Sequence, residues 1–70
     1  MDEKKIQLAK KFNRASDLYG ELVEELIRER YSITQEISLN RQRDVKVTEF
    51  NEYFNYCENC KVRAKQILGI

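Results

Sequence analysis

The sequence predicts an all-α fold with a single domain over residues 1–70. Apolar residues recur at alternating steps of three and four along most of the chain, which is the spacing of helices that each bury one face. No segment shows the alternating, β-branched pattern of a strand, apart from the too-short VKV at residues 45–47. The breaks between periodic segments are short, which suits consecutive helices packed side by side. We therefore expect a three-helix, bundle-like chain.

The first predicted helix is long and covers about residues 4–30. Its main seam consists of Leu8, Phe12, Ala15, Tyr19, Leu22 and Leu26. A second apolar stripe, about a quarter turn away, consists of Ile6, Ala9, Ser16, Gly20, Val23 and Ile27. Gly20 lowers helix stability by roughly 1 kcal/mol relative to alanine. We therefore expect another backbone to approach Gly20 closely, the alternative being a tolerated weak point.

A short second helix is predicted over about residues 33–43. Ser32 followed by Gln35 has the spacing of a capping box, in which the serine hydroxyl accepts a hydrogen bond from a free backbone amide at the helix start. Ile33 and Ile37 lie one turn apart on the side that we expect to face inward.

The third helix is predicted over about residues 49–68. Thr48 precedes Glu49 and Glu52, and a hydroxyl before an acidic first turn is typical of a helix start. Gly69 is placed to cap the other end. The predicted seam of this helix consists of Phe50, Tyr53, Cys57, Cys60, Ala64 and Ile67.

Cys57 and Cys60 both fall on the apolar arc of the third helix. A structural zinc needs about four ligands, and because the chain has no histidine, a second subunit would have to supply two more thiolates. A redox Cys-x-x-Cys pair usually begins a helix after a strand, whereas this pair lies in mid-helix. We expect both thiols to fill the core as small apolar groups, with an intersubunit zinc or disulfide as the alternative. No cofactor or metal is predicted.

The composition limits the classes of function. The chain carries 13 basic and 12 acidic side chains, so its net charge of +1 does not direct it to nucleic acid or to an anionic bilayer. It has no apolar run near the roughly 20 residues of a membrane span and no secretory signal pattern. It also lacks histidine, the commonest general base. We expect a cytoplasmic protein with no membrane partner and no catalytic site.

Charge order and helix length both predict self-association. Basic residues gather over 4–14 and acidic residues over 17–29, an order that opposes the dipole of one long helix and calls for a compensating neighbour. Either a parallel alignment of the first and third helices or two antiparallel copies of the first would bring opposite charges together. At 1.5 Å per residue the first helix would be roughly 40 Å long and the second about 16 Å, so apolar surface would stay open without a second chain.

We therefore predict a homodimeric helical bundle that also has the surface to dock another protein. The predicted interface consists of Leu8, Phe12, Ala15, Tyr19, Gly20, Leu22, Val23, Leu26, Ile27, Phe50, Tyr53, Phe54 and Cys57.

Residues 30–61 resemble small all-helical proteins encoded in bacterial prophages and related mobile elements. The residues that carry the resemblance are Tyr31, Ser32, Glu36, Ile37, Arg41, Arg43, Glu49, Phe50, Tyr53, Cys60 and Lys61. The family usually has a proline after its middle loop, where this chain has Val47. The resemblance implies an accessory or assembly role and assigns no activity.

The predicted function is thus a non-enzymatic oligomerising module. The alternative is a small DNA-binding protein that uses the helix at 32–43. Side chains there that can reach base edges and phosphates are Gln35, Asn40, Arg41, Gln42 and Arg43. We expect Glu36 and Arg41 to form a structural salt link in this region.

Overall fold

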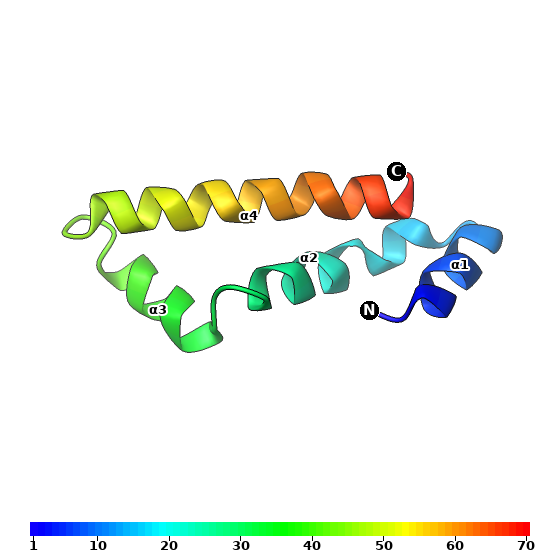
Figure 1. Cartoon of the computed structure of the whole chain (residues 1–70), viewed down its shortest axis with the longest axis horizontal. Coiled ribbons are helices and arrows are strands. Elements are labelled where there is room, and N and C mark those ends of the chain that lie inside the picture. The colour runs from blue at the N-terminus through cyan, green and yellow to red at the C-terminus, as the bar shows by residue number, and fades with distance from the viewer.

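Four α-helices and one short 3-10 helix make up the chain, and no residue lies in a strand. The computed structural model describes all 70 residues. The elements in order are α1 (Glu3–Lys11), η1 (Ala15–Leu18), α2 (Tyr19–Arg28), α3 (Ile33–Arg41) and α4 (Val47–Leu68). In Figure 1, α4 runs along most of the molecule, α2 and α3 follow one another beside it, and α1 lies at the end of the molecule near the start of α2. The all-α prediction is confirmed, with four helices in place of three.

The prediction of one long helix over residues 4–30 is wrong. α1 ends at Lys11, and Asn13 adopts the left-handed conformation with φ 62°. Asparagine is one of the few residues other than glycine that adopts this conformation readily. The turn sends α1 back along α2, and Lys5 Nζ consequently lies 3.1 Å from Glu21 Oε1.

The break also removes the unfavourable charge order. α1 now has Glu3 in its first turn and Lys10 and Lys11 in its last turn, while α2 has Glu21 in its first turn and Arg28 in its last. Both helices therefore place acidic residues near their N-termini and basic residues near their C-termini, as the helix dipole favours. The neighbour that the basic residues of α1 were expected to need is α2 of the same chain, whose Glu21 pairs with Lys5.

α2 and α4 pack antiparallel, so the predicted parallel alignment of the first and last helices is wrong (Figure 1). Tyr56, in the middle of α4, donates a 3.0 Å hydrogen bond to the carbonyl oxygen of Leu26 near the end of α2. Lys65, further along α4, lies over the ring of Tyr19 at the start of α2. The core between these elements consists of Ala15, Leu22, Val23, Leu26, Cys60, Ala64 and Leu68.

α3 begins as predicted and ends at Arg41, two residues before the predicted end. The expectation that Ile33 and Ile37 face inward is wrong, because the two side chains are 57% and 49% exposed. Ser32 Oγ accepts a 3.1 Å hydrogen bond from the amide of Gln35, and Gln35 Oε1 accepts a 2.7 Å bond from the amide of Ser32. The predicted capping box is therefore present.

α4 begins at Val47, two residues earlier than predicted, so Thr48 lies inside the helix and does not cap it. The capping position is held by Lys46, whose side chain makes no capping hydrogen bond. Gly69 ends the helix in the left-handed conformation, with φ 72°, and its amide donates a 2.8 Å bond to the carbonyl of Lys65. The predicted glycine cap is confirmed.

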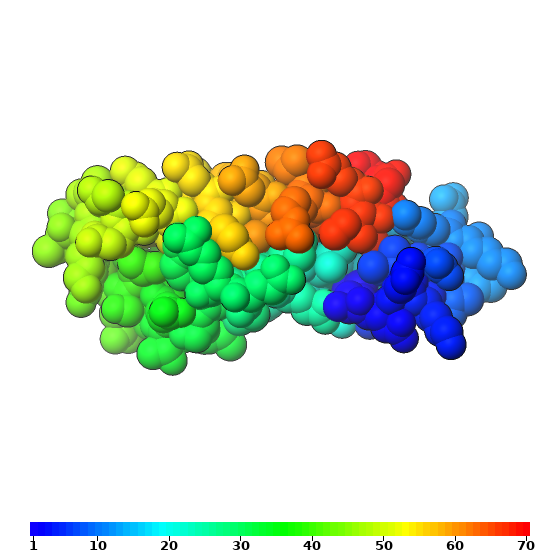
Figure 2. Space-filling model, in the orientation of Figure 1, coloured from blue at the N-terminus to red at the C-terminus, as the bar shows by residue number.

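The molecule is a thin rod, as the space-filling view shows (Figure 2). Its extents are 46 × 18 × 15 Å, and a helix with its side chains is about 10–12 Å across, so there is room for two helices in cross-section. The radius of gyration is 14.2 Å, against about 11 Å for a compact chain of 70 residues. The accessible surface is 5247 Å², against roughly 4,600 Å² for a compact protein of this mass. No third layer of helices covers the two broad faces of the rod.

The expected close approach of a backbone to Gly20 is wrong. A Cβ atom built on Gly20 meets no heavy atom within 4 Å. Gly20 therefore faces open space and lowers the stability of α2 without permitting a close contact, which was the alternative interpretation.

The Gly20→Ala substitution should raise the free energy of unfolding by about 0.4–1 kcal/mol, because alanine restricts the unfolded chain without meeting a neighbour. Gly69→Ala is the matched control and should lower it, because φ 72° at Gly69 strains any side chain. Urea unfolding followed by circular dichroism measures both changes. A loss of stability in Gly20→Ala would show that another surface does pack against this position.

Candidate interaction surface

The residues predicted to form an interface divide into three groups. Those buried inside the single chain are Ala15, Leu22, Val23 and Leu26. Those partly exposed are Tyr19, Ile27, Phe50, Tyr53 and Cys57. Those exposed are Leu8, Phe12, Gly20 and Phe54. The first group forms the core of the chain itself, so the surface available to a partner lies at α1 and at the first half of α4.

Phe50 and Phe54 form an aromatic ridge on the first half of α4. Their ring centroids are 6.4 Å apart, the ring planes differ by 29°, and 51% of Phe54 is exposed. The surrounding residues 47–60 contain Glu49, Glu52 and Glu58 but no lysine or arginine. Glu49 and Glu52 lie on another side of α4, where they line a cleft with α3 residues, and Glu58 is paired with Lys61.

A groove between α1 and η1, here called the basic groove, has a volume of about 650 Å³. Its lining consists of Lys5, Leu8, Ala9, Phe12, Arg14, Asp17 and Leu18. Leu8 and Phe12 remain 56% and 64% exposed. A neighbouring cleft is lined by Lys4, Gln7, Leu8 and Lys11. Residues 4–14 contain five basic side chains and no acidic one, but the lining of the groove also includes Asp17, and Lys5 is paired with Glu21.

Most charged side chains in residues 4–14 and 47–60 have no ion-pair partner within the chain. Of the basic residues in 4–14, only Lys5 forms an ion pair, with Glu21. In the acidic stretch of α4, Glu58 pairs with Lys61, whereas Glu49 and Glu52 form no ion pair. These charges are free to meet opposite charges on another molecule.

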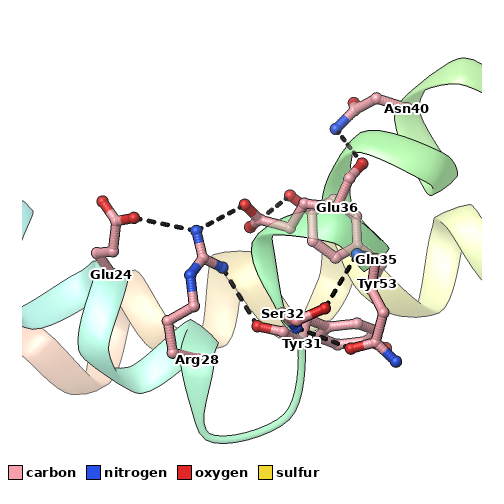
Figure 3. Close-up of polar contacts among 8 residues, drawn as sticks. All are labelled: Glu24, Arg28, Tyr31, Ser32, Gln35, Glu36, Asn40 and Tyr53. Atoms are coloured by element: carbon pink, nitrogen blue, oxygen red, sulfur yellow. Dashed lines mark hydrogen bonds and ion pairs between the residues drawn. The ribbon is translucent and has the colours of Figure 1, made fainter.

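A polar cluster fixes the junction between α2 and α3 (Figure 3). The Arg28 guanidinium donates to Glu24 at 3.0 Å, to Glu36 at 2.9 Å and to the carbonyl oxygen of Tyr31 at 3.3 Å. Tyr53 on α4 donates a 2.8 Å hydrogen bond to the other oxygen of Glu36. The expected link between Glu36 and Arg41 is wrong, because α3 turns Glu36 toward Arg28. The cluster joins three helices through one carboxylate.

The cluster keeps Glu36 ionised. The hydrogen bond from Arg28 lowers the pKa of Glu36, an effect that partial burial opposes and the Tyr53 hydroxyl reinforces. Burial, together with the Glu36 carboxylate, raises the pKa of Tyr53. A carboxylate held in its charged form and a phenol held in its neutral form at pH 7 serve to fix the fold, and neither is tuned for proton transfer near neutrality.

The α3 residues considered for nucleic-acid contacts are exposed, but two of them are engaged locally. The Gln35 side chain closes the capping box, and Asn40 donates a 2.9 Å hydrogen bond to the carbonyl oxygen of Glu36 within α3. Arg41, Gln42 and Arg43 lie at the end of the helix and in the following loop. Two of the five side chains are thus engaged within α3, and the two cations lie at the end of the helix and just beyond it.

The two cysteines are free thiols in different environments. Cys60 is 1% exposed and belongs to the core, while Cys57 is partly exposed. Burial raises the pKa of both thiols. The fold brings together no group of three or more cysteine, aspartate or glutamate side chains that could hold a metal ion.

In the native protein Cys57 should react with a disulfide reagent at least about tenfold faster than Cys60, because Cys57 is partly exposed whereas Cys60 is buried in the core and closed to the reagent. The Cys57→Ser variant retains only the Cys60 thiol, and the Cys60→Ser variant retains only the Cys57 thiol. The absorbance of the coloured product over time gives the two reaction rates. Equal rates in folded protein would mean that the Cys60 side of α4 opens readily.

Comparisons with protein-family models, with curated proteins and with solved structures find no match to this chain. None of its helices combines the length and the apolar character needed to cross a membrane.

Proposed function

We propose that this protein is a non-enzymatic interaction module that associates with a second copy of itself. The observation that supports this most is the number of large apolar side chains that a rod two helices thick leaves exposed. These side chains are Leu8, Phe12, Ile33, Ile37, Val45, Val47, Phe54, Val62, Ile67 and Ile70.

The core of the single chain is small in comparison. Only seven of the 70 residues are buried, and a chain of this length has little stability to spare even when compact. Covering a fully exposed leucine or phenylalanine contributes about 1.5–3 kcal/mol, so covering several half-exposed ones would rival the stability of the chain itself. Association is therefore a strong source of stability for this fold.

We further propose an accessory or assembly role for such a dimer, which is what the resemblance noted in the sequence of residues 30–61 implies. The DNA-binding alternative has less support, since Gln35 and Asn40 are used within α3. Fluorescence anisotropy with a generic DNA duplex at low salt discriminates between the two, because phosphate contacts give binding that weakens steeply as salt rises. We expect no binding.

Sedimentation velocity from about 1 to 100 μM tests the proposal. We expect a species near twice the chain mass of 8.4 kDa that dissociates on dilution. A fully helical species of 8.4 kDa at every concentration would refute it.

A further inference from the structure

α3 lies outside the core of the molecule. The seven core residues belong to η1, α2 and the second half of α4, and none belongs to α3. Within α3 only Glu36 and Leu39 are partly buried, and every residue from 40 to 49 is exposed. In Figure 1, α3 lies beside the first half of α4, whereas α2 lies beside the second half. The burial of apolar surface that stabilises α2 against α4 therefore contributes little to holding α3.

One carboxylate joins α3 to the other helices. Glu36 accepts a 2.9 Å hydrogen bond from Arg28 of α2 and a 2.8 Å hydrogen bond from Tyr53 of α4 (Figure 3). No other hydrogen bond or ion pair runs from α3 to α2 or α4. Between α3 and α4 lies a cleft of about 300 Å³, lined by Tyr31, Gln35, Ser38, Leu39, Glu49 and Glu52. The contact of α3 with α4 is therefore loosely packed and depends on Glu36.

The chain on either side of α3 is placed to act as a hinge. Before α3, the ring of Tyr31 packs edge-on against Tyr53 and Tyr56, with centroids 5.1 and 5.5 Å apart, so the chain is fixed up to this residue. After α3, the turn at 42–46 is exposed throughout, and its amides at 45 and 46 donate only to a carbonyl oxygen of the same turn. α3 can thus move away from α4 without breaking the contacts that end α2.

We propose that α3 and the turn at 42–46, together here called the latch, open as a unit while η1, α2 and the second half of α4 stay packed, and that Glu36 holds the latch closed. A nine-residue helix is shorter than the roughly 12–15 residues that an isolated helix needs in water, so α3 loses its helical hydrogen bonds once it leaves α4. Opening takes the shared acceptor away from Arg28 and Tyr53, so the open form presents a guanidinium and a hydroxyl that the closed form keeps occupied. The latch does not depend on the proposed self-association.

Amide hydrogen exchange followed by NMR tests whether the latch opens separately from the core. After correction for intrinsic exchange rates, amides of residues 37–41 in α3 should exchange at least about a hundredfold faster than those of residues 60–64 in α4. Addition of 1 M urea should accelerate exchange in α4 at least about fivefold, because global unfolding exposes much surface, but exchange in α3 by less than about twofold. One chain concentration is used throughout, since association also changes protection.

Variants in the core and in the latch separate the two kinds of opening. Val23→Ala weakens the core and leaves the contacts of the latch in place, because Val23 is a buried residue of α2. It should accelerate exchange in α4 at least about fivefold and exchange at residues 37–41 by less than about twofold. Glu36→Gln should accelerate exchange at residues 37–41 at least about fivefold. Glu24→Gln, which changes the exposed partner of Arg28, should do so by less than about threefold.

Two results would overturn the latch. If Val23→Ala accelerated exchange equally in α3 and α4, or if urea did so in the natural chain, α3 would open only when the whole molecule unfolds. Unchanged exchange at residues 37–41 in Glu36→Gln would show that Glu36 does not hold α3 closed. The urea comparison needs no substitution, so it decides the first point even if Val23→Ala fails to fold. Sedimentation measures self-association separately, so either proposal can fail without the other.

Discussion

Replacing Leu68 with alanine should lower the free energy of unfolding by about 2–5 kcal/mol. Leu68 is 1% exposed and belongs to the core cluster with Ala15 and Leu22, so it fastens the last turn of α4 to η1 and the start of α2. Truncation removes apolar contacts and leaves a cavity that the thin fold can refill only in part. In a chain whose whole stability is only a few kcal/mol, this loss would unfold a large fraction of the molecules.

Ile67→Ala is the matched control, since Ile67 is the neighbouring residue and is 36% exposed. The Ile67→Ala substitution should lower the free energy of unfolding by less than about 1 kcal/mol. Denaturant unfolding of both variants at the same chain concentration gives the two values. Equal losses would mean that α4 is rotated relative to the core described above.

Replacing Glu36 with glutamine should lower the free energy of unfolding by about 1–3 kcal/mol. The Glu36 side chain is only 19% exposed, and its two oxygens accept hydrogen bonds from Arg28 and Tyr53. The substitution keeps the size of the side chain but removes the charge that the guanidinium needs. Glu24→Gln is the control, because Glu24 also pairs with Arg28 but is 62% exposed. This substitution should lower the free energy of unfolding by about 0.5 kcal/mol or less.

The contribution of Glu36 should also depend on pH. Its pKa is lowered in the folded chain, so the unfolded chain takes up the proton first as the pH falls. The stabilisation is therefore complete above the unfolded value of about 4.3 and is lost as the pH falls through the folded value. Between pH 7 and 3 the natural chain should lose more stability than Glu36→Gln. If the free energy of unfolding fell equally with pH in the two proteins, the Glu36 carboxylate would not be held in its charged form.

The helical class, the capping box at Ser32 and the glycine cap at Gly69 could be predicted from the sequence because local chemistry decides each of them. The break after Lys11 was missed because the apolar spacing continues through it, from Phe12 to Ala15. Two signals were available. Asn13 tolerates the left-handed conformation, and the order of charges opposes the dipole of an unbroken helix but suits two shorter ones.

The inner seam of α4 was predicted correctly at Cys60 and Ala64 and missed by one residue at its end. Steps that alternate three and four average 3.5 residues, whereas a straight helix has 3.6 residues per turn, so the buried position drifts along α4 from Ile67 to Leu68.

The candidate site was predictable only in part. Leu8, Phe12, Phe50 and Phe54 were identified as apolar surface residues, but the groove exists only because α1 folds back beside η1. The arrangement of those elements depends on the turn at Asn13, which the apolar pattern does not reveal.

Thermal unfolding at different chain concentrations tests most directly whether association stabilises this thin fold, as we propose. For a dimer of this size whose folding and association are coupled, the midpoint temperature should rise by about 5 °C for each tenfold increase in concentration. Circular dichroism between about 2 and 200 μM covers two such steps. A midpoint that stays constant across this range, with full helix content at the lowest concentration, would contradict the account.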